Sequence, residues 1–382
     1  MSGKTILILG GGIGGIAAAS RLRKALPREH RVVLVERETH YLFAPSLLWL
    51  MVGLRKPEQI SRPLPALAGR GVEIVRGTVE GIDPGNRSAR VNGREIKADY
   101  LIVALGAEFA PETVPGLAQA DHDFYTLAGA ESLRDARLAL RRGRIVVLVS
   151  SVPFKCPAAP YEAAMLLEYD CRKRKLRDSL HLDVYTPEPG PMPVAGPKVS
   201  ADIRGMIEAK GIGFHPEHAV NAVDPAARRI SFTNGANADF DLLAYVPPHR
   251  PPAVVRESGL AGESGWVPVD RARLETRFRG VFAIGDVTGI MLKMGRPLPK
   301  AGVFAHGEAE IVADNIAAEI AGRGERRTFD GQGECFVEIG DGKAAFGSGN
   351  FYAEPVPEVR LRGPNRALHL GKIAFEKYWL FG

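Results

Sequence analysis

The stretch Thr5–Gly15 reads TILILGGGIGG and predicts the fold of this chain of 382 residues. Its first five residues form an apolar run of strand length, and a helical pattern follows from Ile16 to about Leu26. Glycines with the spacing G-x-G-x-x-G join the two, and such glycines let backbone amides approach a pyrophosphate without a Cβ in the way. These glycines are Gly10, Gly12 and Gly15. The pattern predicts the first strand, turn and helix of a dinucleotide-binding unit.

An acidic residue completes this unit. A second apolar strand, Arg31–Val35, is followed by Glu36, where a carboxylate accepts hydrogen bonds from an adenosine ribose. A glycine motif alone is weak evidence. Strand, glycines, helix, strand and terminal acid in this order predict a bound dinucleotide.

Two further strands indicate which dinucleotide it is. Gly280–Asp286, GVFAIGD, is apolar and ends in a carboxylate that suits the ribityl hydroxyls of a flavin. Tyr100–Glu108, YLIVALGAE, resembles the strand that closes the FAD domain in flavoproteins with two dinucleotide domains. We therefore predict FAD, with Gly106 and Asp286 among its contacts.

A second strand, turn and helix occupy Arg144–Arg174, but here the phosphate signal is missing. Ser150, Val152 and Lys155 stand where the three glycines are expected, and Cys156 follows. Prolines 153, 157 and 160 stiffen this turn and remove amide donors. The next strand, at 181–185, ends without a ribose acid. We interpret the unit as a Rossmann-like domain that carries a cysteine in the turn where a nucleotide would otherwise bind.

The sequence LPKAG at 298–302 is expected to open a long helix that runs to about Ala321. Pro299 suits its first turn, and Lys300 at the positive helix end is placed to face the pyrimidine part of the flavin. The alternative is a solvated lysine at a helix start. The aromatic run at 40–53 is either core or a cover for the flavin ring.

Composition limits the classes of function. The hydrophobic fraction of 45% and the absence of any long apolar run are typical of a globular protein without a membrane-spanning helix. No signal-peptide pattern opens the sequence, so we expect a cytoplasmic or peripheral membrane location. The net charge of +6 fits either a solvated surface or attraction to anionic lipids, and nucleic-acid binding is not expected. Three cysteines without C-x-x-C spacing predict neither a disulfide framework nor a metal site.

These features predict an α/β protein with two Rossmann-like domains, as in glutathione-reductase-like flavoproteins. The expected domains are 1–110 with 248–325 for FAD, 111–247 for the degenerate second unit, and 326–382 for a small C-terminal region that faces a membrane and a quinone.

With these motifs, the sequence resembles the sulfide:quinone oxidoreductase family, which is related to flavocytochrome c sulfide dehydrogenase. The most specific features are the proline-framed Cys156 and the C-terminal Cys335 in GECFVEIGDG. The resemblance implies that these two cysteines form a redox-active disulfide beside the flavin. It also implies an amphipathic C-terminus, LHLGKIAFEKYWLF at 368–381, that docks on a bilayer and admits quinone.

The family mechanism is expected here with particular roles. Hydrosulfide attacks the disulfide, a thiolate activated by electropositive surroundings reduces the flavin, and Glu162 moves protons. For Glu162 the alternative is a carboxylate that stabilises a helix N-terminus. A quinone is expected near Phe351, Tyr378 and Trp379.

The sequence departs from the family in two places. No cysteine follows Glu36 in the segment 41–46, which favours noncovalent FAD. The third catalytic cysteine of many bacterial members is missing before strand 145–149, and Cys171 is expected to be an ordinary helix residue. A related sulfur compound therefore stays open as the substrate.

Two rival functions are kept. One is an NAD(P)H-dependent flavin oxidoreductase resembling type II NADH dehydrogenases, and the other is a catalytically silent flavoprotein that senses sulfur or redox state. A homo-oligomer is left open.

Overall fold

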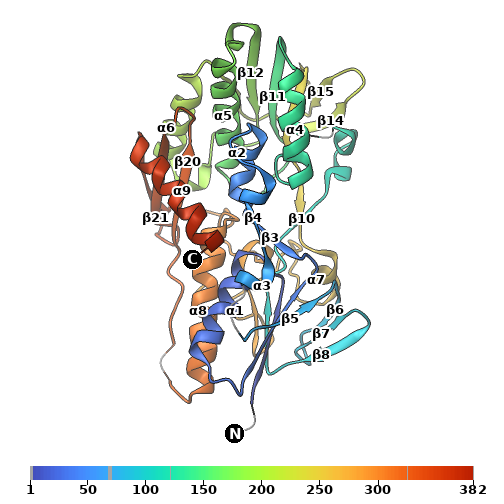
Figure 1. The fold of residues 1–382 in the computed structure, drawn as a ribbon, viewed down its shortest axis with the longest axis vertical. Helices are drawn as coiled ribbons and strands as arrows, with labels where there is room; N and C mark the ends of the chain where they lie inside the picture. The colour runs from blue at the N-terminus through green and yellow to red at the C-terminus, as the bar shows by residue number, and fades with distance from the viewer. Residues whose placement is uncertain (1–2, 68–70, 121, 325, 382) are drawn as a thin grey trace. The chain divides into compact units, whose positions relative to one another are not determined.

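The computed structural model describes residues 3–67, 71–120, 122–324 and 326–381 (Figure 1). The chain divides into two compact units, each assembled from three separate segments. Unit 1 comprises Met1–Tyr41, Arg62–Glu108 and Arg250–Gly333, and unit 2 comprises Leu42–Ser61, Phe109–His249 and Glu334–Gly382.

Unit 1 is built on a parallel sheet of five strands in the order β19-β9-β1-β2-β5. The strands are β1 (Thr5–Leu9), β2 (Arg31–Glu36), β5 (Glu73–Arg76), β9 (Tyr100–Val103) and β19 (Val281–Ala283). Strand β1 is buried almost throughout, as expected for a central parallel strand that is covered on both faces. Helices α1 (Ile13–Ala25) and α8 (Gly302–Ile320) pack side by side along this unit (Figure 1).

Smaller elements complete unit 1. An antiparallel sheet contains β6 (Val79–Asp83), β7 (Ser88–Val91) and β8 (Arg94–Lys97), and α7 (Ala253–Glu257) packs on β6. The turn between β6 and β7 begins with the sequence Asp83-Pro84-Gly85. The short elements α3 (Leu64–Leu67), β3 (His40–Leu42) and β4 (Ser61–Pro63) lie near the points where the chain passes between units.

Unit 2 contains a second parallel sheet, in the order β13-β12-β11-β17. Its strands are β11 (Gly143–Val149), β12 (Leu180–Tyr185), β13 (Gly213–His215) and β17 (Leu242–Val246). Ile145 and Val147 of β11 belong to one core cluster, and Val146 and Leu148 belong to another. The sheet therefore has two buried faces, because successive side chains of a strand point to opposite sides.

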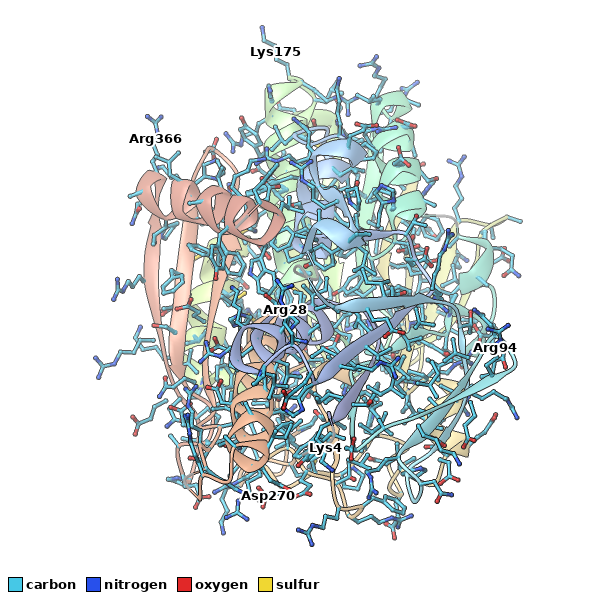
Figure 2. The ribbon with its side chains drawn as sticks, turned by 60° about the horizontal axis from the view of Figure 1, so that its bottom comes forward. Lys4, Arg28, Arg94, Lys175, Asp270 and Arg366 are labelled. Carbon is cyan, nitrogen blue, oxygen red and sulfur yellow. The ribbon has the colours of Figure 1, made fainter. Side chains whose placement is uncertain are left out.

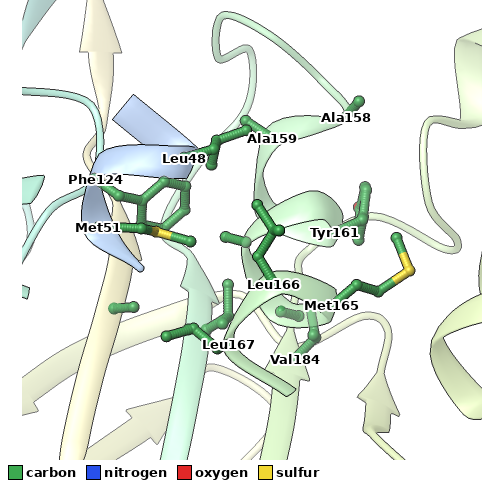
Figure 3. Packing of buried hydrophobic residues seen from close by; sticks show 14 of the residues in the cluster. Leu48, Met51, Phe124, Ala158, Ala159, Tyr161, Met165, Leu166, Leu167 and Val184 are labelled. Atoms are coloured by element: carbon green, nitrogen blue, oxygen red, sulfur yellow. The ribbon is translucent and has the colours of Figure 1, made fainter. Parts of the chain in front are cut away.

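Helices cover one of these faces and a small antiparallel sheet covers the other. The helices are α4 (Leu127–Ala139), α5 (Ala159–Lys173) and α6 (Pro197–Glu208), and the antiparallel strands are β14 (Val220–Asp224), β15 (Arg229–Phe232) and β16 (Asn237–Asp239). Helix α2 (Leu47–Met51) is buried at every residue and packs on α4 and α5. Figure 3 shows Leu48 and Met51 of α2 beside Leu166 of α5 in this cluster.

The C-terminal segment adds a three-stranded sheet and a helix to unit 2. The strands are β20 (Gln332–Glu338), β21 (Ala344–Asn350) and β22 (Glu358–Asn365), and α9 (Arg366–Phe381) packs on β21 and β22 (Figure 1). The units thus divide the chain differently from the expected boundaries. Residues 42–61 and 334–382 join unit 2, because α2 lies in its core and because the Glu338 N–H donates to the buried Glu162 of α5.

Charged side chains are spread over the surface of the chain. Arg94 lies on β8 and Arg366 on α9, whereas the other labelled basic residues, Lys4, Arg28 and Lys175, lie in loops or turns (Figure 2). Across the residues that the structure describes, no helix is long and apolar enough to cross a membrane. The two parallel sheets agree with the predicted fold class of paired Rossmann-like domains.

Candidate active site

The predicted FAD contacts of unit 1 gather at one edge of its sheet. The contacts are Gly10, Gly12 and Gly15 after β1, Glu36 at the end of β2, Gly106 after β9, and Asp286 after β19. Because these strands are parallel and adjacent, their carboxyl ends meet at the same edge, where doubly wound proteins bind nucleotides.

The glycines of the first turn have different tasks. Gly10 adopts a φ of 103°, and a Cβ there would lie 2.4 Å from the Ala104 oxygen. A Cβ on Gly15 would lie 1.8 Å from the Gly10 oxygen, so this glycine permits the close approach of α1 to the turn. A Cβ on Gly12 would meet nothing within 4 Å, and the same holds for Gly106, whose φ is 67°. Gly12 and Gly106 thus border open space at the edge where a pyrophosphate is expected.

Glu36 faces this turn directly. Its Oε2 accepts a hydrogen bond from the Gly11 N–H at 2.6 Å, and Oε1 accepts one from the Glu38 N–H at 2.9 Å. A carboxylate has about four lone-pair sites, so further acceptor capacity remains for ribose hydroxyls. The position agrees with the role expected from the sequence.

The turn that carries Asp286 is held by two buried ionisable side chains. The Lys300 ammonium donates to the Asp286 backbone oxygen at 2.6 Å and to the Thr288 oxygen at 3.1 Å. Glu308 of α8 accepts from the Gly285 N–H at 2.6 Å. Lys300 also lies 3.4 Å from the ring centroid of Trp266, a cation–π contact.

This geometry corrects the expectation for Lys300. Helix α8 begins at Gly302, so Pro299 lies outside the first helical turn and Lys300 is not a helix-start residue. The lysine is buried rather than solvated, because the turn folds its ammonium onto backbone carbonyls. Burial lowers the pKa of Lys300 to about 8, and burial raises the pKa of Glu308 to about 8.

The residues of unit 1 fit a flavin dinucleotide. Open space at Gly12 and Gly106, an acid at the end of β2 and a carboxylate after β19 correspond to its pyrophosphate, ribose and ribityl groups. When bound, FAD would supply a two-electron acceptor.

The corresponding turn of unit 2 is built differently. The β1–α1 turn has three residues, 10–12, whereas the β11–α5 turn has nine, 150–158. Ser150 is buried and its hydroxyl donates to the Val246 oxygen at 2.5 Å. Cys156 has a φ of 54°, a left-handed conformation that costs a non-glycine residue about 1 kcal/mol or more. The turn therefore has no glycine cradle and holds its cysteine in a constrained backbone.

Cys335 on β20 is the second thiol of this region. Its Sγ donates to the Phe336 oxygen at 3.3 Å, and both Cys156 and Cys335 pack against the same hydrophobic cluster. No disulfide links the cysteines in the part of the chain that the structure describes. Negative charge on Cys156 raises the pKa of Cys335, so the two thiols are electrostatic neighbours.

The surroundings of Cys335 differ from the electropositive site expected from the family. Burial raises the pKa of Cys335 well above its usual range, and charge on Cys156, Glu162 and Glu334 raises it further. Lys372 opposes them. The thiol form of Cys335 is therefore favoured in this structure.

Glu162 connects the thiol region to α9. Its Oε1 accepts from the Glu338 N–H at 2.7 Å and also pairs with the ammonium of Lys372. Glu162 lies in the first turn of α5, but its hydrogen bonds go to β20 and α9. Sequence reasoning missed Lys372, although it recurs at helical spacing with His369 and Glu376.

The remaining predicted residues lie in different environments. Phe351 is buried just after β21, whereas Tyr378 on α9 is 64% exposed. Trp379 makes edge contacts with Phe375 and Tyr378. Cys171 is a buried residue of α5 whose pKa burial raises to about 11, in keeping with an ordinary helix position.

Comparisons with known proteins identify the family. A model described as pyridine nucleotide-disulphide oxidoreductase matches residues 4–309. The chain is 28% identical to the sulfide-quinone reductase of Aquifex aeolicus, over 99% of this chain and 90% of that protein. The mitochondrial sulfide:quinone oxidoreductase of Mus musculus is 24% identical over 92% of this chain and 79% of its own.

A solved structure agrees with these relatives. The X-ray structure of the sulfide:quinone oxidoreductase from Aquifex aeolicus matches with a TM-score of 0.88 and 25% identity, covering 98% of this chain and 90% of that one. The chain belongs to the pyridine nucleotide-disulphide oxidoreductase family. The predicted class, an FAD-dependent oxidoreductase, and the predicted resemblance to sulfide:quinone oxidoreductases are confirmed.

Proposed function

We propose that this protein oxidises sulfide, or a related low-molecular-weight sulfur compound, and passes two electrons through FAD to a quinone. The observation that carries the proposal is the pair of thiols in unit 2. Cys156 occupies the turn where a nicotinamide nucleotide would bind, and its charge acts on Cys335. The relatives named as sulfide:quinone oxidoreductases support the same reaction.

The proposed chemistry uses an oxidised form of this thiol pair. Hydrosulfide attacks one sulfur of a Cys156–Cys335 disulfide, so that one S–S bond breaks, a new one forms as a persulfide, and the other cysteine leaves as a thiolate. A second thiolate of low molecular weight accepts the outer sulfur, which leaves two reduced cysteines. Re-forming the Cys156–Cys335 disulfide would release two electrons and two protons, and bound FAD would supply the two-electron acceptor between the thiols and the quinone. The sum is sulfide oxidised by two electrons and quinone reduced by two.

Glu162 is the proposed proton carrier for this cycle. The carboxyl group is 2% exposed, acts on Cys335 electrostatically, and pairs with Lys372. Protons released by hydrosulfide and thiol need an acceptor near the sulfur atoms, and a carboxylate in this position can serve.

The outer face of α9 is the proposed membrane contact. Leu370 and Phe381 are 63% and 58% exposed, and Tyr378 on the same helix is 64% exposed, while Lys372 and Glu376 are buried. The inner side of α9 also carries apolar residues, since Leu380 is buried and Phe375 packs on Phe43. The exposed apolar side chains are therefore additional to those that pack on the core, and they suit insertion at a lipid interface. Arg366 and Lys377 are exposed on the same helix and favour anionic lipids. We propose that the quinone enters near Tyr378 and Trp379, with Phe351 as a third contact.

The rival function as an NAD(P)H oxidoreductase lacks the same support from unit 2. Ser150 fills the place of the first glycine, and β12 ends in Tyr185, whose ring stacks on His215 at 4.2 Å between centroids. Neither residue offers a cradle for a pyrophosphate or an acid for a ribose.

The test is anaerobic mixing of the FAD-loaded protein with sulfide or with NADH, followed by flavin absorbance. Sulfide should bleach the flavin rapidly and NADH poorly. Cys156→Ser and Cys335→Ser should each abolish bleaching by sulfide, whereas Cys171→Ser serves as the matched control and should not change it. Bleaching by NADH alone would replace the proposal with the nicotinamide-dependent rival. Bleaching by neither donor would favour the silent sensor.

A further inference from the structure

Helix α9 presents ionisable side chains to the body of unit 2. His369, Lys372 and Glu376 recur at spacings of three and four residues, and each pairs with a group on another element. Lys372 and Glu376 are 6% and 0% exposed. A helix whose sole task was attachment to a lipid surface would not need buried charges on its opposite side, because burying each charge costs free energy unless it is paired.

Glu376 anchors α9 to the body of unit 2. Its carboxylate accepts hydrogen bonds from Arg55 Nε at 2.9 Å, from Arg55 Nη2 at 3.0 Å, and from the Ser46 hydroxyl at 2.6 Å. A forked guanidinium–carboxylate contact of this kind has a defined geometry. The Arg55 guanidinium also lies 4.4 Å from the ring centroid of the buried Trp49.

The position of Lys372 depends on how Glu376 holds α9. Its ammonium pairs with Glu162 and lies 5.1 Å from the ring centroid of Trp49. The positive charge of Lys372 acts on Cys335, opposite in sign to the charges of Cys156, Glu162 and Glu334. His369, one turn earlier, pairs with Glu338 at 2.9 Å, so β20, the strand that carries Cys335, is also tied to α9.

We propose that Lys372 is a positioning residue through which α9 controls the reactivity of the Cys335 thiol. When α9 is in its observed position, the ammonium pairs with Glu162 and its charge stabilises a thiolate on Cys335; a displaced α9 would withdraw that charge. The inference rests on the proposed role of Cys335 as a reacting thiol. It adds to that role a coupling between the helix proposed to meet the membrane and the site of sulfur chemistry.

The experiment measures the reactivity of Cys335 without using turnover. In a Cys156→Ser, Cys171→Ser background, Cys335 is the remaining cysteine of the chain. The rate of its alkylation by iodoacetamide is followed by mass spectrometry between pH 7 and 11, on the full-length FAD-loaded protein. Alkylation requires the thiolate, so the pH midpoint of the rate reports the thiol's ionisation.

Lys372→Met should move the midpoint to higher pH by about one unit, which is about a tenfold loss of rate on the acidic side. Lys372→Arg keeps the charge and should restore most of the rate. Lys198→Met, which removes an exposed lysine of α6, is the matched control and should leave the profile unchanged. An unchanged midpoint in Lys372→Met, or an equal shift in Lys372→Arg, would show that Lys372 merely packs.

Glu376→Gln tests control by the helix, because it weakens the contact between α9 and Arg55 without substituting Lys372 itself. A shift in the same direction as Lys372→Met is expected, and an unchanged profile would overturn the coupling to α9. This variant also tests the proposal if Lys372→Met does not fold. Failure of sulfide to bleach the wild-type flavin, with the Lys372→Met shift present, would reject the proposed function and keep this inference. The reverse pattern would reject the inference alone.

Discussion

The Lys300 ammonium lies 2.6 Å from the backbone oxygen of Asp286, beneath the turn that presents the Asp286 carboxylate. Glu308 accepts a hydrogen bond from the N–H of the preceding residue, Gly285. The hydrogen bonds of the Lys300 ammonium are charge-assisted and contribute about 1.5–3 kcal/mol, and the bond to Glu308 adds about 0.5–1.5 kcal/mol when its carboxyl group is protonated. Together they are sufficient to fix the direction of a short turn. The position of Asp286 is therefore set by α8 and by the residues that precede it.

Lys300→Met should weaken FAD binding by about tenfold, because the loosened turn presents Asp286 less well. The measurement is fluorescence quenching when FAD is titrated into the apoprotein. Lys300→Arg should recover part of the affinity, and Lys293→Met, an exposed lysine of the same loop, is the control. Equal affinities for Lys300→Met and wild type would mean that the turn is held without Lys300.

Because Glu308 is buried, we expect the stability of the protein to depend on pH. Burial raises the pKa of Glu308 from 4.5 to about 8, so the folded state retains a proton that the unfolded state releases between these pH values. The free energy of unfolding should therefore fall as pH rises through this window, by up to about 1.4 kcal/mol per pH unit from this group. Glu308→Gln should flatten that fall in urea titrations from pH 5 to 8. Glu310→Gln, two residues further along α8 and part-exposed, should keep the wild-type slope.

The glycines of the first turn should respond differently to substitution. Gly12→Val should give folded but colourless protein, because a Cβ at this position fills the open space at the sheet edge. Gly15→Ala should instead destabilise the fold by about 1–3 kcal/mol or more, because its Cβ would meet the Gly10 oxygen. Gly205→Ala in α6, where a Cβ meets nothing within 4 Å, is the control. Flavin absorbance and thermal unfolding separate these outcomes, and a yellow Gly12→Val protein would contradict the first.

FAD should be released by acid or heat. The segment 37–53 contains no cysteine that could attach the flavin covalently. After precipitation with acid, the yellow colour should stay in the supernatant. Colour that remains with the precipitated chain would show a covalent link through another residue.

Signals in the sequence were reliable where structure depends on neighbours along the chain. Thr5–Leu9 forms β1 as predicted, and Glu36 ends β2, because apolar runs and glycine spacing act locally. Lys300 was misplaced because a helical pattern does not show how the residues before it turn. Glu162 of α5 and Lys372 of α9 are 210 positions apart in the sequence, so no local pattern reveals their contact.

The structure changes what is expected when α9 is removed. If α9 served only to attach the protein to a membrane, deletion of 368–382 would weaken attachment and leave sulfide reduction of the flavin largely intact. The same deletion would strip Lys372 from Glu162 and Glu376 from Arg55, and breaking a buried ion pair by removing one partner costs about 3–5 kcal/mol. We therefore expect the truncated protein to be unstable and its thiol chemistry impaired, as thermal unfolding and sulfide bleaching would show.

Membrane attachment is better tested on the exposed face of α9. Leu370→Glu with Phe381→Glu replaces two exposed apolar side chains and leaves Lys372 and Glu376 in their buried contacts. Cosedimentation with vesicles containing anionic lipid should fall by about tenfold or more, because two apolar contacts are lost and two negative charges are added. Reduction of the flavin by sulfide should stay at the wild-type rate, whereas turnover with a membrane quinone should fall. A matched variant, Leu138→Glu on α4, replaces another exposed leucine and should not affect vesicle binding. Undiminished binding of the α9 variant would place the membrane contact elsewhere on the protein.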